Sequence, residues 1–229
     1  MNLIRKHPQC AIILSANLGS FDPELPWATQ KPWSTGMPIS ICQFNDKNFP
    51  PRDKAMTSRL QPGIVKMFGW QVMPGFDYYI WVDGSKTITS PDFGAWMMDE
   101  LGSADMAVFK HPERKTIKEE YEFVKRKLEE RNGYLLSRYG GEWLDEQYRA
   151  IVGDRVFKDT ILYASTAFVY RPNARIKAAF KEWWYHKTRY LLHDQLALPY
   201  VLARGKVKVN TIDANIYKLS YWEHTRKRR

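Results

Sequence analysis

The sequence has few of the residues and motifs on which several common kinds of site depend. Only Cys10 and Cys42 are cysteines among 229 residues, which excludes a disulfide framework and a cysteine-based metal site and fits a reducing cytosol. There is no Gly-x-Gly-x-x-Gly and no Gly-Lys-Ser/Thr, so neither a dinucleotide fold nor a P-loop is supported. Hydrolase triads and zinc sites have no support either, because no Ser-His-Asp, His-Glu-x-x-His or Cys-x-x-Cys arrangement occurs.

Long apolar runs are absent as well. The N-terminal segment 1–8 lacks a long apolar signal core, and no later run is long and apolar enough to span a membrane. Together with the low cysteine content, this predicts a soluble cytoplasmic protein with no membrane span.

The composition favours one large domain that covers residues 1–229. Hydrophobic residues make up 44% of the chain and aromatic residues 14%, which is ample material for a core. No internal repeat, low-complexity segment or linker interrupts it. The formal charge of +10, from 35 basic and 25 acidic residues, points to an anionic partner such as nucleic acid, nucleotide phosphates or an acidic glycan.

Apolar runs and amphipathic patterns alternate along the chain. They predict strands at residues 10–17, 37–44, 77–85, 105–110, 160–163, 167–170 and 207–212. They predict helices at residues 56–70, 89–101, 117–132, 134–150 with a break at Gly140-Gly141, 174–192 and 196–204. The strand, helix and strand between residues 77 and 110 predict a βαβ unit. The fold class is therefore predicted to be α/β, with a mostly parallel central sheet flanked by helices.

The run Asp77-Tyr78-Tyr79-Ile80-Trp81-Val82-Asp83-Gly84-Ser85 joins a buried strand to a polar turn. Gly84 permits a sharp turn at the carboxyl end of the strand, the edge at which ligands bind in open α/β sheets. Asp83 and Ser85 would project from this edge as hard oxygen groups, which suit Mg²⁺ or Mn²⁺ and the phosphates that such ions carry. An ordinary Asp-Gly turn is the alternative.

Polar residues also follow two other predicted strands. Asn17 ends the first strand and opens a polar turn, as at the start of many nucleotide sites. His111, Glu113 and Arg114 follow the strand at 105–110. Arg114 could reach a phosphate or carboxylate held near Asp83 with its planar guanidinium. A loop that carries ordinary surface charges is the alternative for His111 and Arg114.

A third polar cluster, His193-Asp194-Gln195, lies between two apolar or aromatic helical stretches. Such a run is costly to bury unless it is paired, so it suits a site where Asp194 binds a hydroxyl or takes its proton. Asp194 is equally well suited to be a helix N-cap. His224, near the C-terminus, is a candidate metal ligand, although a lone histidine there is more often exposed.

In this order, the clusters resemble a known family. A helix that ends at Met67-Phe68-Gly69-Trp70 precedes the run from Phe76 to Ser85, then come His111-Pro112-Glu113-Arg114 and a charged helix with Glu119 and Glu120, and His193-Asp194-Gln195 is last. The pattern covers residues 56–204 and resembles the glycosyltransferase-like domains of plant proteins of seed-mucilage and pollen-turgor control, with their bacterial and phage relatives. These relatives typically read Tyr-Asp-Tyr-x-Ile-Trp-Ile-Asp-Gly, then His-Pro-x-Arg, then Asp-Gln.

The resemblance implies a GT-A-like domain that binds a nucleotide sugar and transfers the sugar to a hydroxyl acceptor with the help of a divalent metal. In such domains an Asp-x-Asp-type motif holds Mn²⁺ or Mg²⁺ on the donor diphosphate. Here the motif is Asp83-Gly84-Ser85 and the second carboxylate is missing. Either Ser85, water or His224 completes the metal shell, or Arg114 and Lys86 neutralise part of the charge.

The implied roles fall into three groups. The donor-binding residues would be Asn17, Asp83, Gly84, Ser85, Lys86, His111 and Arg114. The acceptor-binding residues would be His193, Asp194 and Gln195; Asp194 and Asp83 would be catalytic, and Asp83, Ser85 and His224 would bind the metal. The acceptor is open between a modified DNA base, which the net charge and the Arg226–Arg229 tail favour, and a surface polysaccharide.

Two other functions are compatible with parts of the sequence. A non-catalytic nucleic-acid-binding protein would use the basic surface and stacking aromatic residues. It would have no need of Asp83, which would repel phosphate in the absence of a metal. A metal-dependent phosphohydrolase would require more clustered acids than the one at Asp83.

Overall fold

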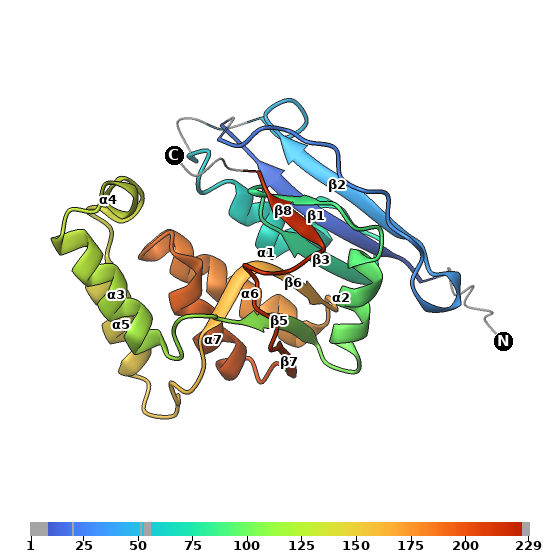
Figure 1. Ribbon diagram of the computed structural model, residues 1–229. Helices are drawn as coiled ribbons and strands as arrows, with labels where there is room; N and C mark the ends of the chain where they lie inside the picture. The colour runs from blue at the N-terminus through green and yellow to red at the C-terminus, as the bar shows by residue number, and fades with distance from the viewer. Residues whose placement is uncertain (1–8, 20, 51, 53–55, 226–229) are drawn as a thin grey trace.

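The computed structural model describes residues 9–19, 21–50, 52 and 56–225, and its centre is a six-stranded sheet (Figure 1). The strand order is β2 (Ile39–Asn45), β1 (Ala11–Asn17), β3 (Tyr78–Val82), β6 (Tyr163–Tyr170), β5 (Met106–Lys110) and β7 (Val209–Ile212). Strand β1 pairs in parallel with β2 and β3, β5 pairs in parallel with β7, and β6 runs antiparallel to β3 and β5. The predicted α/β class with a mostly parallel sheet is confirmed.

Helices cover both faces of this sheet. Side chains alternate along a strand, so β3 sends Tyr79 and Trp81 to one face and Ile80 to the other. The first face packs against helices α1 (Pro62–Val72), α6 (Ala174–Arg189) and α7 (Asp194–Arg204), and the second against α2 (Phe93–Leu101). Three further helices, α3 (Ile117–Glu129), α4 (Gly133–Tyr139) and α5 (Leu144–Val152), lie beyond α7, away from the sheet (Figure 1).

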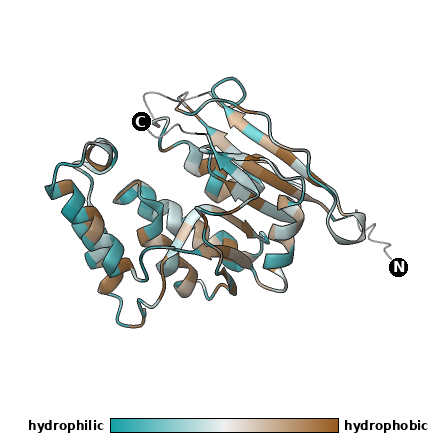
Figure 2. Cartoon of the chain, viewed as in Figure 1, coloured by the Kyte–Doolittle hydropathy of each residue, from teal (hydrophilic) through white to brown (hydrophobic). Residues whose placement is uncertain are grey.

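Hydropathy follows this layering. Figure 2 shows hydrophobic residues along β1, whose first six residues are buried, and a mixture of hydrophilic and hydrophobic residues on α3. The helix break predicted at Gly140-Gly141 is confirmed, because α4 and α5 are separate helices on either side of it. Two elements were not predicted, a short 3-10 turn η1 (Ser34–Gly36) and a two-stranded antiparallel sheet of β4 (Lys86–Ile88) and β8 (Trp222–His224).

One predicted feature of the sheet is wrong, and another has an unexpected arrangement. Strands β3 and β5 run parallel with α2 between them in the chain, as the predicted βαβ unit requires, but β6 lies between the two strands in the sheet. Of the strands predicted at 160–163 and 167–170, residues 160–162 are not in a strand, and Tyr163 belongs with the second run to the single strand β6 (Tyr163–Tyr170). The pairing of β6 with β5 shifts register between Ala164 and Phe168, so a bulge and not a turn lies at Ser165 and Thr166. The carboxyl ends of β1, β2, β3 and β5 still share one edge.

Some sequence predictions concern residues that the structure does not describe. The Arg226–Arg229 tail and the segment 1–8 lie outside the described residues. In the part of the chain that is described, no helix combines the length and the apolar character needed to cross a lipid bilayer. The prediction of a single domain over residues 1–229 stays a prediction.

Candidate functional site

A cleft of about 370 Å³ opens at the carboxyl edge of the sheet, where β1 and β3 end. Its walls are the turns after these two strands, the bulge of β6, and parts of α1, α4 and α7. Seven of the predicted site residues line it: Asn17, Asp83, Gly84, Ser85, His193, Asp194 and Gln195. The cleft thus brings together segments that are far apart in the sequence.

The turn after β3 is fixed by close packing. A Cβ atom on Gly84 would lie 2.6 Å from the carbonyl oxygen of Ala16 in β1, so a side chain larger than hydrogen would push the two segments apart. The backbone N–H of Asp83 donates to the Thr166 carbonyl at 2.8 Å, and Trp81 Nε1 donates to Asp83 Oδ1 at 2.8 Å. These contacts hold the Asp83 carboxylate at the cleft.

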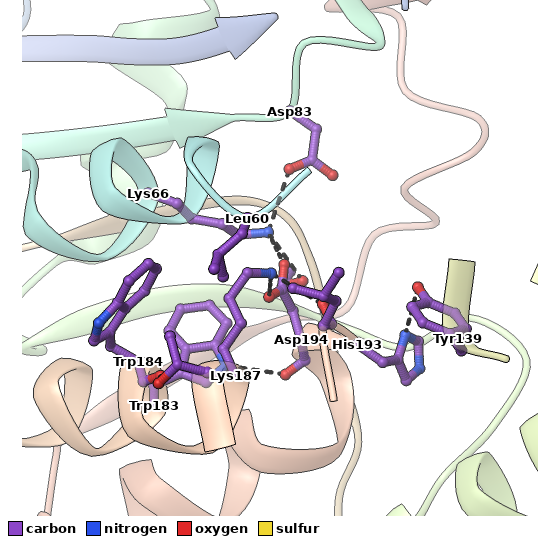
Figure 3. Close-up of polar contacts among 12 residues, drawn as sticks. Leu60, Lys66, Asp83, Tyr139, Trp183, Trp184, Lys187, His193 and Asp194 are labelled. Carbon is purple, nitrogen blue, oxygen red and sulfur yellow. Dashed lines mark hydrogen bonds and ion pairs between the residues drawn. The ribbon is translucent and has the colours of Figure 1, made fainter. Parts of the chain in front are cut away.

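The two predicted carboxylates meet through a lysine. Lys66 Nζ lies 2.7 Å from Asp194 Oδ2 and 3.3 Å from Asp83 Oδ1, and it also donates to Ser165 Oγ at 3.2 Å (Figure 3). Lys187 Nζ lies 2.6 Å from Asp194 Oδ1, on the other side of the same carboxylate. The result is a chain of alternating charges, Asp83–Lys66–Asp194–Lys187, which we call the ion-pair chain.

The helices are packed closely enough for this chain to form. Lys66 comes from α1 and Lys187 from α6, and a Cβ on Gly63 would lie 2.9 Å from the Trp184 ring and 3.0 Å from Lys187. Glycine at this position therefore lets α1 lie against α6. Trp183 Nε1 donates to the carbonyl of Asp194 at 3.0 Å and fixes the start of α7.

Asp194 is ionised by its surroundings. Burial alone would raise its pKa, but the Lys187 and Lys66 ammonium groups outweigh burial and hold the pKa well below the usual range of a carboxyl group. Burial alone would lower the pKa of Lys66, but Asp194 and Asp83 outweigh it and raise that pKa. The N-cap alternative for Asp194 is wrong, because α7 begins at Asp194, His193 is its N-cap, and the carboxylate pairs with the two lysines.

His193 is held by Glu120 and Tyr139, neither of which the sequence marked as a site residue. Its Nε2 lies 2.6 Å from Glu120 Oε1 on α3, and its Nδ1 lies 3.1 Å from the Tyr139 hydroxyl on α4. Glu120 is buried. Burial alone would raise its pKa, but the hydrogen bond and charge of His193, with Arg114, lower it to about 2. The buried carboxylate therefore anchors the residue that precedes Asp194.

His111 and Arg114 do not line the cleft. His111 Nδ1 accepts from the backbone N–H groups of Glu113 and Arg114, at 3.2 and 3.0 Å, and so holds the turn after β5. The Arg114 guanidinium pairs with Glu120 and with Glu113. Their distance from the donor site has a structural cause, since β6 separates β5 from β3. Their link to the cleft is indirect, through Glu120 and His193, and their role in donor binding stays a prediction.

Lys86 and His224 lie beside a second cavity. Lys86 Nζ is 2.7 Å from His224 Nε2, across the β4–β8 pair, and burial lowers the pKa of Lys86 to about 8. Lys86, but not His224, lines this second cavity of about 350 Å³, which also contacts Asn17 and Gly84. The two cavities therefore adjoin at the turns after β1 and β3.

The donors near Asp83 do not fit a resident divalent cation. Within the described ranges, no group of three or more His, Cys, Asp or Glu side chains could hold a metal ion. Asp83 Oδ1 already accepts from Trp81 and Lys66, and a metal ion there would face the Lys66 ammonium at close range. His224 is engaged with Lys86. The predicted need for Mn²⁺ or Mg²⁺ at Asp83, Ser85 and His224 stays untested.

Other cleft residues have simpler environments. The Asn17 side chain bonds to the backbone of Asp22, at 2.6 Å from Nδ2 to the carbonyl oxygen, and braces the turn after β1. The side chain of Gln195 makes no hydrogen bond within the described part of the chain. Its amide is therefore available to a ligand.

Sequence reasoning missed the basic residues of the cleft, which are Arg59, Lys66, Arg138 and Lys187. Two signals were present. Lys66 interrupts an apolar helical pattern between Val65 and Met67, and Lys187 continues the aromatic stripe of α6 four residues after Trp183. No such signal marks Arg59 or Arg138.

Several solved structures are similar to this chain, among them a mouse xylosyltransferase, the galactosyltransferase LgtC and A197 from STIV. No protein-family model matches the chain, and no curated protein matches it. Mouse xyloside xylosyltransferase 1, in its apo form, is 10% identical with a TM-score of 0.39, over 77% of this chain and 63% of that one. The chain thus spans less than two thirds of the length of that enzyme.

The other two structures are similar over more of the chain. The galactosyltransferase LgtC, in complex with donor and acceptor sugar analogs, is 13% identical with a TM-score of 0.38, over 89% of this chain and 73% of that one. A197 from STIV is 7% identical with a TM-score of 0.32, over 90% and 82%. Membership of the family of plant mucilage and turgor proteins is not shown by these comparisons and stays a prediction.

Proposed function

We propose that this protein is a glycosyltransferase, which moves a sugar from a nucleotide-sugar donor to a hydroxyl acceptor. The observation that carries the proposal is the ion-pair chain, in which Asp83 and Asp194 meet through Lys66 in one cleft. The cleft lies at the sheet edge where α/β proteins bind ligands. Its 370 Å³ and the adjoining 350 Å³ are in the size range of sites for small molecules and cofactors, and provide separate space for the two halves of a nucleotide sugar.

The two carboxylates suit different tasks. Asp194 is bound on both oxygens by ammonium groups, which makes it a weak base and a good acceptor of hydrogen bonds from sugar hydroxyls. Asp83 uses only Oδ1 for its contacts within the described residues, so Oδ2 is open to the cleft. We assign to Asp83 the removal of the acceptor proton and to Gln195 a hydrogen bond to a hydroxyl group.

The acceptor is a compound with a free hydroxyl group. The cleft is more polar than a site for an apolar ligand would be, because Asn17, Ser85, Thr166 and Gln195 line it. A modified DNA base and a surface glycan are both compatible with this chemistry. Neither has further support from the described residues.

Thermal-shift screening of nucleotide sugars tests the proposal. The wild-type chain should be stabilised by one class of nucleotide sugar, by about 2.7 kcal/mol at a hundred times Kd, or about 5–10 °C in Tm. Asp83→Ala should keep most of this shift, because Asp83 is assigned to the acceptor proton and not to the donor, and it should lose transfer of the sugar. Asp213→Asn is the matched control, because Asp213 is exposed and lines neither cavity, and it should keep both the shift and the transfer. If no nucleotide sugar shifts the wild type while DNA binds tightly and in a salt-dependent way, the chain is a nucleic-acid-binding protein.

A further inference from the structure

Two arginines on the wall of the cleft have no carboxylate partner. Arg59 precedes α1 and Arg138 belongs to α4, and both line the cleft. Neither guanidinium forms an ion pair with an acidic side chain among residues 9–19, 21–50, 52 and 56–225, although burial alone would lower the pKa of Arg138 and the charge of Asp194 is one of the influences that raise that pKa. By contrast, Lys66 and Lys187 are fully matched by Asp83 and Asp194.

Both arginines line the same cleft, and their guanidinium groups contact neutral groups. Arg59 Nη1 donates to the carbonyl of Ser137 at 2.5 Å, and Ser137 is the residue before Arg138. The Arg59 guanidinium also lies 5.7 Å from the centre of the Phe21 ring. Arg138 Nη1 donates to the Tyr134 hydroxyl at 3.1 Å. Arg138 also bonds to Tyr139 and lies over the Tyr134 and Tyr139 rings. These contacts orient both guanidinium groups and leave most of their N–H donors without a partner in the described part of the chain.

The charge of the cleft is positive because of these residues. Four basic and three acidic side chains line it, which gives a formal charge of +1: Arg59, Lys66, Arg138 and Lys187 against Asp22, Asp83 and Asp194. The Asp83 corner cannot attract a phosphate, since its carboxylate would repel one and Lys66 is already committed to two carboxylates. An anion that enters the cleft is therefore drawn to the Arg59 and Arg138 side.

We propose that Arg59 and Arg138 form a clamp for the diphosphate of the donor, and that this clamp binds the diphosphate without a divalent metal ion. Paired guanidinium groups bind phosphate oxygens in a bidentate manner, with charge-assisted hydrogen bonds. The clamp rests on the proposed function, because that function identifies the ligand as a nucleotide sugar. The clamp adds to the proposed function the residues that contact the diphosphate, and it assigns to side chains of this chain the role that a metal ion would otherwise have.

The clamp also has a role in the transfer step. The bond between the anomeric carbon and the diphosphate oxygen breaks, and its electron pair leaves with the nucleoside diphosphate. The acceptor oxygen forms the new bond to the anomeric carbon, and its proton passes to Asp83. The leaving diphosphate gains one negative charge, which the two guanidinium groups stabilise.

Inorganic pyrophosphate is the probe for this clamp, because it carries the diphosphate without base or sugar. Titration calorimetry in excess EDTA should show binding to the wild type. Arg59→Gln and Arg138→Gln should each weaken binding about tenfold, the loss expected for a charge-assisted contact. Arg126→Gln is the matched control: Arg126 is exposed, lies near a phenylalanine ring as Arg59 does, and is outside the cleft, so binding should not change.

Four outcomes would contradict the clamp. The first two are that the wild type does not bind pyrophosphate, and that it binds pyrophosphate only when Mn²⁺ or Mg²⁺ is present. The other two outcomes are that both glutamine variants bind pyrophosphate as well as the wild type does, and that Arg126→Gln weakens binding as much as they do. Arg59→Lys and Arg138→Lys separate charge from geometry, because lysine keeps the charge but not the bidentate fork. Circular dichroism confirms that each variant is folded.

The clamp and the proposed function can fail separately. If pyrophosphate binding depends on the two arginines but no nucleotide sugar binds or reacts, the clamp stands and the glycosyltransferase proposal fails. If a nucleotide sugar binds with full affinity to both glutamine variants, the glycosyltransferase proposal stands and the clamp fails.

Discussion

At the scale of single residues, Lys66 joins the two acids of the cleft, because its ammonium group pairs with both Asp83 and Asp194. Asp83 and Asp194 are recognisable because each lies in a polar cluster that interrupts apolar surroundings. Their meeting through Lys66 depends on how closely α1 packs on α6, and no local pattern reveals that. His111 and Arg114 were predicted to lie near Asp83, but Arg114 pairs with Glu120 because the strand that precedes these residues is two positions away from β3 in the sheet.

Lys66 should be a residue on which both stability and function depend. Its ammonium is buried between Asp83 and Asp194, so Lys66→Met leaves two carboxylates without their shared partner. Breaking a buried pair in this way should lower the free energy of unfolding by about 3 kcal/mol. Urea unfolding near neutral pH measures this loss in the free energy of unfolding. Lys118→Met, at an exposed pair on α3, is the control and should change stability by less than about 0.5 kcal/mol.

A double-mutant cycle measures the direct interaction between Lys66 and Asp194 and separates it from unrelated destabilisation caused by either substitution. Asp194→Asn alone and Lys66→Met alone should both destabilise the protein, and the double variant should lose less than the two together. The coupling energy expected for residues in one ion-pair network is about 1–3 kcal/mol. Simple additivity of the two changes would contradict the direct interaction.

At the scale of elements, the periodicity of the sequence predicts most strands and helices, but it does not predict which strands lie next to each other in the sheet. The run at 77–85 and the strand at 105–110 are both present, yet the order of strands places β6 between them. The short β4 and β8 carry too few residues for a period-two pattern. Two short strands were predicted where the structure has the single strand β6 (Tyr163–Tyr170). A bulge in its pairing with β5 keeps the strand continuous through Ser165 and Thr166, and local periodicity does not reveal such a bulge.

Asp105 connects the start of α6 to the segment before β7 through its hydrogen bonds. Its carboxylate accepts from Arg175 and Asn173 at the start of α6 and from the backbone N–H of Lys208 before β7. The hydrogen bond from Arg175 is the main cause that lowers the pKa of Asp105 from 3.8 to about 2. Because the folded-state pKa is depressed, this group contributes stability above about pH 4 and loses it as pH falls toward about 2.

The size of that contribution is on the order of 2 kcal/mol, from a shift of about two pKa units. Asp105→Asn should therefore destabilise the protein by about that amount near neutral pH, and its unfolding free energy should fall less between pH 4 and 2 than that of the wild type. Urea unfolding at a series of pH values measures both effects. Equal pH dependence of the two proteins in this window would contradict the assignment.

At the scale of the whole molecule, the rule that ligands bind at the carboxyl edge of an α/β sheet located the cleft correctly. Both cavities lie at that edge, and seven of the predicted site residues line the larger one. The net charge of +10 indicated an anionic ligand but not where it binds. The structure adds the positions of Arg59 and Arg138, the two cleft cations that form no ion pair within the described residues.

The most direct test of the account is the release of nucleoside diphosphate from the nucleotide sugar that the thermal-shift screen identifies, with and without candidate acceptors. We expect the wild type to release the diphosphate, with Asp83→Asn slowing release at least about 100-fold as expected for loss of a general base. Asp213→Asn should match the wild type. No release by the wild type, or release that Asp83→Asn leaves unchanged, would contradict the account.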